Sequence, residues 1–315
     1  MLSTRLGAAG PNVSALGLGA MGMSDFYGPA DETESIATIH AALEAGVTLI
    51  DTGDFYGMGH NEMLIGDALK GGRRDKAILS IKFGAQRGPD GAWLGYAADP
   101  NAVKTALSYT LKRLRVDYID IYRPARVSPL VPIEDTIGAI ADLVRQGYVR
   151  HIGLSEAGAD SIRRAHKVHP IVDLQIEYAI ITRGLEREIL PTLRELGIGV
   201  TAYGVLSRGL ISESALAGGS KGGFRAHSPR FQGENLDKNL ALVRALKEIA
   251  DSKGVSVAQL AIAWVRSRGP DIVPLIGARK RARLAEALGA MDVALSPGAH
   301  RRCGAAGGCG WGALP

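Results

Sequence analysis

The sequence is poor in cysteine, in aromatic side chains and in long apolar runs. Its two cysteines, Cys303 and Cys309, both lie close to the carboxyl end of the 315 residues. The rest of the chain therefore offers no disulfide framework and no thiolate metal site. No apolar run approaches the length of a membrane span, and no basic start followed by a long apolar stretch indicates a signal peptide. These absences exclude a disulfide-rich or membrane-spanning class and predict a cytoplasmic protein.

Charge of one sign is not concentrated in any segment either. The 37 Lys and Arg against 32 Asp and Glu give a net charge of +5, but there is no run of like charges and no nucleic-acid-binding motif. No pair of histidines has metal-ligand spacing. We therefore expect scattered surface charge and no nucleic-acid, membrane or metal partner. The oligomeric state stays open.

What the sequence does contain is a regular alternation of short apolar segments and helical patterns. The strand candidates are Ala15–Gly19, Val47–Asp51, Ala77–Lys82, Tyr118–Tyr122, Val149–Leu154, Val172–Ile176, Gly199–Ala202 and Ile272–Ile276. The helical patterns are Thr33–Ala45, Glu62–Lys70, Ala102–Leu114, Ile133–Arg145, Ala159–Val168, Glu186–Leu196, Asn239–Lys253, Val257–Arg266 and Arg281–Leu288. Strands that are continuously apolar are typical of parallel strands covered on both faces.

This pattern predicts an α/β fold, a single-domain (β/α)8 TIM barrel. The alternative, a doubly wound open sheet, lacks the Gly-x-Gly-x-x-Gly expected after its first strand. Residues 2–6 and 12–13 predict an N-terminal hairpin that closes the barrel bottom. The long Gly-, Ser- and Arg-rich stretch between Tyr203 and Asn239 follows the seventh strand, where such a loop is usually functional. Residues 1–297 form the predicted domain, and the glycine-rich residues 298–315 predict an irregular tail without a stable helix.

An acid, a phenol and an amine occur at the ends of neighbouring predicted strands. Asp51 and Tyr56 lie in Asp51-Thr52-Gly53-Asp54-Phe55-Tyr56, and Lys82 ends the next strand. An ammonium beside the phenol stabilises phenolate and is expected to lower the tyrosine pKa, while the carboxylate holds the ammonium in place. The tyrosine can then act as a general acid. Ser155, Gln175 and Tyr203 also come at strand ends on the same face, where polar groups of a barrel indicate an active site.

These residues resemble the catalytic set of the aldo-keto reductase superfamily, which is Asp, Tyr, Lys and His. The likeness covers about residues 1–297 and includes Gly17-Leu18-Gly19-Ala20-Met21-Gly22-Met23-Ser24, Gly153-Leu154-Ser155-Glu156 and Arg230-Phe231-Gln232-Gly233-Glu234-Asn235. The fourth member is absent. Where the family reads Tyr-Gln-His-Arg-Val-Asp-Pro, this chain reads Arg123-Pro124-Ala125-Arg126-Val127-Ser128-Pro129, so Ala125 stands at the histidine position.

The resemblance implies reduction of a small carbonyl compound with NADPH, and Tyr56 as the proton donor tuned by Lys82 and Asp51. It implies that Ser155 and Gln175 bind the nicotinamide carboxamide and that Tyr203 stacks on the ring. The segment with Gly204, Leu206 and Arg208 is implied to run along the pyrophosphate, and the long loop to fold over it. After the eighth strand, Arg279 is implied to meet the 2′-phosphate and Arg283 to add a second basic contact. Gly277 and Glu286 complete the implied cofactor set.

Ala125 leaves three alternatives for the reaction. A neighbouring Arg123, Arg126 or His227 replaces the histidine, or the larger pocket suits a bulkier carbonyl substrate or the reduction of a conjugated double bond. In the third alternative the protein is a slow NADPH-binding sensor or binding subunit. The expected pocket wall consists of Met23, Phe26, Phe55, Trp93 and Ala125.

Overall fold

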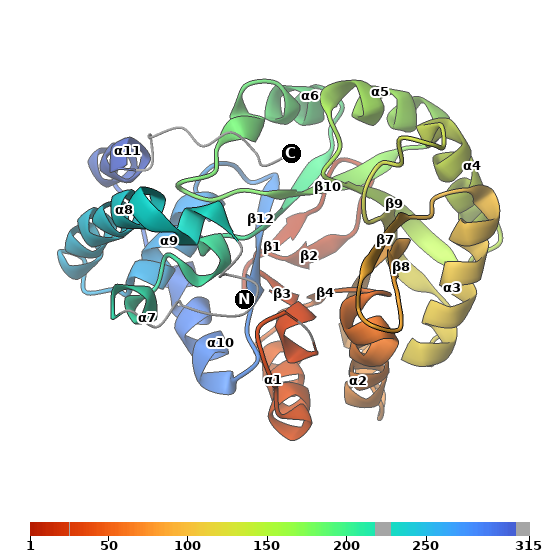
Figure 1. Ribbon diagram of the computed structural model, residues 1–315, viewed down its shortest axis with the longest axis horizontal. Coiled ribbons are helices and arrows are strands. Elements are labelled where there is room, and N and C mark those ends of the chain that lie inside the picture. Colours follow the sequence, from red (N-terminus) through yellow and green to blue (C-terminus); the bar gives the residue numbers. More distant parts are fainter. Residues whose placement is uncertain (25, 218–227, 307–315) are drawn as a thin grey trace.

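Eight parallel strands close into a barrel in the order β10-β11-β12-β3-β4-β5-β8-β9 (Figure 1). The structure is a computed structural model and describes residues 1–24, 26–217 and 228–306. The barrel strands are β3 (Gly17–Gly19), β4 (Leu49–Gly53), β5 (Ile78–Phe83), β8 (Ile119–Pro124), β9 (Val149–Ser155), β10 (Ile171–Glu177), β11 (Gly199–Tyr203) and β12 (Ile272–Gly277). Every residue of β4 and β8 is buried, as expected for strands covered on both faces. The predicted TIM barrel is confirmed.

Helices surround the barrel (Figure 1). They are α1 (Glu32–Glu44), α2 (His60–Ala68), α3 (Pro100–Leu114), α4 (Ile133–Arg145), α5 (Ala159–Val168), α6 (Ile189–Glu195), α7 (Glu213–Leu216), α8 (Gly233–Asp251), α9 (Val257–Arg266), α10 (Arg281–Leu288) and α11 (Pro297–Ala306). Short 3-10 helices are η1 (Met21–Met23), η2 (Tyr56–Gly59), η3 (Arg73–Lys76), η4 (Gly184–Glu186), η5 (Ser207–Gly209), η7 (Pro229–Phe231) and η8 (Gly289–Asp292).

The predicted N-terminal hairpin is present as β1 (Ser3–Arg5) and β2 (Asn12–Ser14), which pair in antiparallel register. Leu6 and Val13 of this segment pack with Leu49, Val172 and Val273, which lie at or next to the amino ends of their strands. The hairpin thereby closes one end of the barrel with apolar side chains. The polar strand ends lie at the other end.

Sequence reasoning missed a second hairpin, β6 (Ala85–Arg87) with β7 (Trp93–Tyr96), which follows β5 directly. The long connection after β11 contains the short helices η5, α7 and η7. Helix α8 begins at Gly233 rather than at Asn239. Residues 218–227, which include His227, lie outside the described residues.

The prediction of an irregular carboxyl-terminal tail is wrong for residues 297–306, which form α11. This helix packs against α8, and its Ala299 and Cys303, four residues apart, are buried. Arg183 Nη1 also donates to the carbonyl oxygen of Gly304 at 3.2 Å. Small side chains on one face allow close packing, and that packing outweighs the low helix propensity of the glycines. Residues 307–315 lie outside the described part of the chain.

Candidate active site

Asp51, Tyr56 and Lys82 come together at the carboxyl ends of β4 and β5. The two strands pair in parallel with Gly53 opposite Lys82, which brings their polar ends to one edge. Lys82 Nζ lies 2.5 Å from Asp51 Oδ1 and 5.1 Å from the centre of the Tyr56 ring. Tyr56 begins η2 and is 7% exposed. The three side chains thus form one buried group.

Asp51 is held by more than the lysine. Its second oxygen, Oδ2, accepts hydrogen bonds from Ser80 Oγ at 2.8 Å and from Gln175 Nε2 at 2.7 Å. Burial lowers the pKa of Lys82, and the Asp51 charge opposes that effect. The carboxylate therefore favours the charged form of the lysine, against burial, in a place that water barely reaches.

The expectation of a lowered tyrosine pKa is overturned. Burial raises the pKa of Tyr56 well above its usual value, and the Asp51 charge raises it further. The Asp51 carboxylate lies 2.5 Å from the Lys82 ammonium and offsets part of the positive charge that the phenol meets. Tyr56 therefore retains its proton at physiological pH and has it available to donate.

Ser155, Gln175 and Tyr203 lie on the neighbouring strands β9, β10 and β11. In the pairing of β10 with β9, Gln175 lies opposite Ser155. In the pairing of β10 with β11, Glu177 lies opposite Tyr203. Ser155 and Gln175 are buried, and Gln175 reaches across the barrel to Asp51. Burial raises the pKa of Tyr203, as do the charges of Glu156 and Glu177. The structure thus connects Gln175, one of the predicted nicotinamide-binding residues, directly to Asp51.

Glu177 organises the segment after β11. Its carboxylate lies 2.9 Å from Arg230 Nη1 and 3.7 Å from Arg208 Nη2. Gly204 adopts a φ of 68°, and a side chain there would meet Glu177 Cγ at 3.0 Å. A residue other than glycine would be both strained and crowded at this turn. Leu206 is half-buried against the main core.

The predicted phosphate-binding residues follow β12, where Gly277 ends the strand and is exposed. Arg279 Nη1 donates to the carbonyl oxygens of residues 27, 28 and 29 at 2.8, 3.1 and 3.1 Å. Arg283 Nη1 pairs with Glu286 Oε2 at 2.8 Å. At the start of α10, Glu34 accepts both the backbone N–H and the guanidinium of Arg281. This end of the site is basic and already binds the carboxylate of Glu34.

Three of the predicted pocket residues form an aromatic cluster. The ring centroids of Phe26 and Trp93 are 6.2 Å apart, those of Phe55 and Trp93 are 5.9 Å apart, and Phe55 contacts Tyr56 at 4.7 Å. Trp93 belongs to the unpredicted hairpin and is 51% exposed. Met23 differs from the prediction, because it is buried in the main hydrophobic core. The cluster forms an apolar wall beside the phenol.

Arg123 cannot replace the missing histidine as proposed from the sequence. Its side chain is fully buried inside the barrel, where Nη1 pairs with Asp173 Oδ2 at 3.0 Å and Nη2 donates to Ser80 Oγ at 2.8 Å. Thr201 Oγ1 donates to the same aspartate at 2.5 Å. A side chain at position 153 would approach Asp173 Oδ1 to 2.5 Å, so Gly153 makes room for the pair.

These interior groups were not predicted. A polar residue inside an apolar strand, such as Ser80 between Leu79 and Ile81 or Asp173 between Val172 and Leu174, was the available signal. Together they extend the polar network from Lys82 and Asp51 across the barrel to β11.

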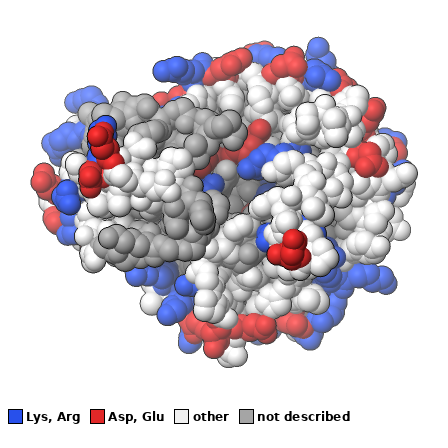
Figure 2. Space-filling view, viewed as in Figure 1, with Lys and Arg blue, Asp and Glu red and all other residues white. Residues whose placement is uncertain are grey.

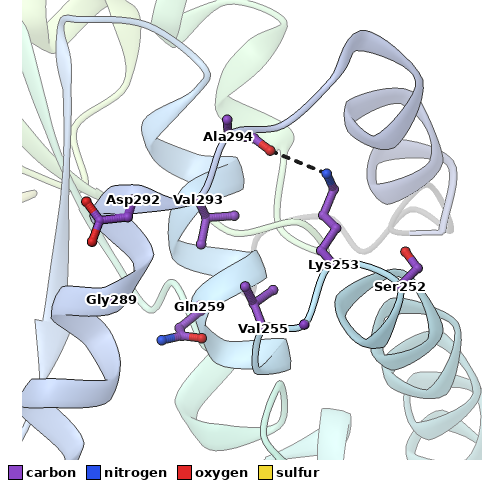
Figure 3. Close-up of a pocket in the computed structure, with 9 residues that line it drawn as sticks. Ser252, Lys253, Val255, Gln259, Gly289, Asp292, Val293 and Ala294 are labelled. Carbon is purple, nitrogen blue, oxygen red and sulfur yellow. Dashed lines mark hydrogen bonds between the residues drawn. The ribbon is translucent and has the colours of Figure 1, made fainter.

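The face shown in Figure 2 is hollowed near its centre, where charged side chains of both signs are visible. A separate depression with a volume of about 520 Å³ lies between α8, α9 and η8 (Figure 3). Lys253, which donates to the carbonyl oxygen of Ala294, is part of its lining. None of its lining residues belongs to the predicted site.

Within the described ranges no cluster of three or more His, Cys, Asp or Glu side chains is arranged to bind a metal ion. None of the helices in the described part of the chain combines the length and apolar character that a bilayer crossing requires.

Comparison with known proteins gives a consistent result. The sequence model of the aldo/keto reductase family matches residues 15–306. A probable aldo-keto reductase of Glycine max is 43% identical over 297 residues, which are 93% of this chain and 85% of the relative. A glycerol dehydrogenase of Gluconobacter oxydans superposes with a TM-score of 0.86 at 26% identity, over 96% of this chain and 94% of that one.

A thermostable aldo-keto reductase solved with the inhibitor epalrestat has a TM-score of 0.80 at 30% identity, over 97% of this chain and 100% of that chain. An aldo-keto reductase of Bacillus halodurans, solved in its holo form, has a TM-score of 0.81 at 26% identity, over 97% of this chain and 96% of that one. The barrel, the polar strand ends and the family match agree, and the chain belongs to the aldo/keto reductase family.

Proposed function

We propose that this protein is an NADPH-dependent reductase that converts a small aldehyde or ketone to an alcohol, with Tyr56 as the proton donor. Membership of the family makes it an oxidoreductase of carbonyl compounds that uses a nicotinamide cofactor. The observation that carries the finer proposal is the buried Asp51–Lys82 pair beside Tyr56.

The residues present fit a phosphate-bearing cofactor. Cations at a helix amino end are unfavourable for the helix itself, yet Arg281 and Arg283 lie in the first turn of α10. A phosphate at that end makes the arrangement favourable, and Arg279 retains Nε and Nη2 for such a contact. In the proposed assignment Arg279 and Arg283 bind the 2′-phosphate, in the segment that also holds Gly277 and Glu286.

The remaining cofactor residues are assigned in the same way. Ser155 and Gln175 bind the carboxamide, Tyr203 lies against the ring, and Gly204, Leu206 and Arg208 border the pyrophosphate. Bound NADPH supplies a hydride for the carbonyl carbon. Gln175 still has its carbonyl oxygen for the cofactor, because only its amide nitrogen is used on Asp51.

The proton chemistry follows from the buried group. A substrate carbonyl oxygen beside the hydroxyl accepts the Tyr56 proton as negative charge develops on it. The Lys82 ammonium, held by Asp51, stabilises the phenolate that remains. The aromatic wall of Phe26, Phe55 and Trp93 excludes water from one side of the reacting carbonyl.

The first test is cofactor preference. We expect NADPH to bind about 10- to 100-fold more tightly than NADH, because a charge-assisted hydrogen bond contributes about 1.5–3 kcal/mol. Fluorescence titration of the wild type and of Arg279→Met measures it. The preference should shrink in the variant, and equal affinities in the wild type would contradict the NADPH assignment.

The second test removes the proton donor. Tyr56→Phe should lower carbonyl reduction by about 10²- to 10⁴-fold and leave NADPH affinity almost unchanged, since only the hydroxyl is lost. A variant that keeps most of the wild-type turnover would show that another group delivers the proton. Binding of NADPH by the wild type without turnover on any aldehyde, ketone or enone would instead favour the sensor alternative raised by Ala125.

A further inference from the structure

At the position where the family has a histidine, this chain has Ala125, and the neighbouring side chain is that of Arg126. Ala125 follows β8 directly, and its backbone N–H donates to the carbonyl oxygen of Phe83 at 2.8 Å, one residue after Lys82. Arg126 folds back over this point, and its Nη1 donates to the Ala125 carbonyl oxygen at 2.7 Å. The methyl side chain of Ala125 is buried and offers no donor. The guanidinium is therefore a side-chain donor held directly beside the histidine position.

The charge of Arg126 reaches the site. Burial raises the pKa values of Tyr56 and Tyr203, and the Arg126 charge acts against that rise at both phenols. It also adds to the burial effect that lowers the pKa of Lys82. These effects agree with the geometry, in which the guanidinium is bonded to Ala125 and the Ala125 backbone is bonded to Phe83, next to Lys82. Its side chain is half-buried, so solvent screens it less than a surface arginine.

Other cations of this region have partners of their own. Asp51 pairs with Lys82, Asp173 pairs with Arg123, Glu177 is shared between Arg208 and Arg230, and the guanidinium of Arg87 lies over the rings of Phe26 and Trp93. Arg126 forms no ion pair with any residue in the described ranges, and its one hydrogen bond there uses a single N–H. An arginine has five N–H donors in a planar fork. The site therefore presents an uncompensated cation with free donors.

We propose that Arg126 takes over the contact to the substrate and selects 2-oxo acids, in which a carboxylate adjoins the reacting carbonyl. The planar fork can bind the carbonyl oxygen and a carboxylate oxygen side by side, which a single imidazole nitrogen cannot do. The apolar wall of Phe26, Phe55 and Trp93 favours an aryl group on the far side of the carbonyl. The inference rests on the proposed carbonyl reduction and narrows its substrate.

The reaction balances with the groups already named. The carbonyl carbon gains hydride from the reduced nicotinamide, the C=O π bond breaks, and the oxygen takes the Tyr56 proton. The product is a 2-hydroxy acid, and the phenol regains its proton from solvent. The carboxylate remains unchanged throughout.

The test compares benzoylformate with its methyl ester, which has the same ketone but no charge. We measure kcat and KM for both in the wild type, Arg126→Met, Arg126→Lys and Arg164→Met, the last being a surface arginine on α5. The ratio of kcat/KM for acid over ester should fall about 10- to 100-fold in Arg126→Met. It should be partly retained in Arg126→Lys and unchanged in Arg164→Met. Guanidinium ions added to Arg126→Met should restore part of the acid activity.

A binding measurement separates this inference from the proposed function. Quenching of tryptophan fluorescence reports the binding of benzoylformate and of the ester to the protein saturated with NADP⁺, whether or not turnover occurs. Arg126→Met should weaken binding of the acid about 10- to 100-fold and that of the ester little. An acid-to-ester ratio that is the same in wild type and Arg126→Met, in kinetics and in binding, overturns the inference while wild-type carbonyl reduction stands. Circular dichroism and NADPH affinity of each variant confirm that it is folded.

Discussion

Two aspartates that are close in sequence lie in opposite surroundings. Asp51 accepts hydrogen bonds from Lys82, Ser80 and Gln175. Asp54 Oδ2 accepts a hydrogen bond from the backbone N–H of Gly84 at 3.1 Å, and its Oδ1 is buried with no hydrogen-bond partner among the described residues. Burial raises the pKa of Asp54 to about 7. Burial with so few hydrogen-bond donors makes the charged form of Asp54 unfavourable.

Asp54 gives the protein a defined pH dependence of stability. The folded carboxyl holds its proton up to about pH 7, whereas an unfolded aspartate releases it near pH 4. The native state binds more protons in between, so this contribution to stability decreases from about pH 4 to about pH 7 and is constant above that. Asn cannot ionise, so the free energy of unfolding of Asp54→Asn should not have this pH dependence. Its difference from the wild-type value should therefore change in favour of the variant by about 1–3 kcal/mol from pH 5 to pH 8.

Denaturant unfolding of wild type and Asp54→Asn at both pH values measures this difference. Asp75→Asn, at an exposed position, is the matched control. The same stability difference at pH 5 and pH 8 would show that Asp54 is ionised in the folded protein throughout.

At the scale of elements, the alternation of apolar segments was sufficient to predict all eight barrel strands. Their ends shifted by up to two residues, for example Gly17–Gly19 against the expected Ala15–Gly19, because hydrogen bonding to neighbours and not hydropathy ends a strand. Asp51, Tyr56 and Lys82 were predictable because each follows an apolar strand.

The partners of those residues were not predictable from the sequence. That Gln175 bonds Asp51, or that Asp173 pairs with Arg123, depends on the order in which strands close the barrel. The hairpin that carries Trp93 has too little apolar alternation to stand out from a loop. The direction of the Tyr56 pKa shift was misjudged, because burial outweighs the neighbouring positive charge.

Helix α11 was missed because local propensity was weighed without tertiary contact. Cys303 is fully buried and faces α8, so a charged side chain there should be costly. Cys303→Asp should lower the free energy of unfolding by about 1–3 kcal/mol, since the carboxyl would be buried without a partner. Arg302→Asp, one residue earlier and exposed, should change it by less than about 0.5 kcal/mol.

Thermal melting of both variants and of a chain truncated after Ser296 provides the measurement. The truncated chain should melt at a lower temperature, because α8 loses its cover. Equal melting temperatures for all three and the wild type would mean that α11 contributes nothing to the fold.

At the scale of the whole molecule, a polar chain crosses the barrel interior. It runs from Lys82 through Asp51, Ser80 and Arg123 to Asp173, and it joins β4, β5, β8 and β10. Arg123 Nε and Asp173 Oδ1 find no hydrogen-bond partner within the described ranges. Arg123 and Asp173 thus depend on each other for their buried charges, although each keeps one polar atom without a hydrogen bond among the described residues.

This arrangement predicts strongly non-additive mutations. Asp173→Asn should destabilise the protein by about 3–5 kcal/mol, because it leaves the Arg123 charge buried alone. The double variant Arg123→Met with Asp173→Leu should recover most of that loss, since apolar groups of similar size need no partner. Guanidinium unfolding of Arg123→Met, of Asp173→Leu and of the double variant measures the coupling. A double variant no more stable than the worse single variant would refute it.

The glycine that makes room for this pair has a consequence for how the sequence can change over generations. A methyl group at position 153 would collide with Asp173. Loss of the Arg123 or the Asp173 charge would leave the other charge buried without a partner. Single substitutions at Gly153, Arg123 or Asp173 should therefore destabilise the barrel. Arg123 and Asp173 can change without loss only together, and Gly153 is required for as long as the pair is present. A library that varies one of the three positions at a time should yield mostly destabilised proteins.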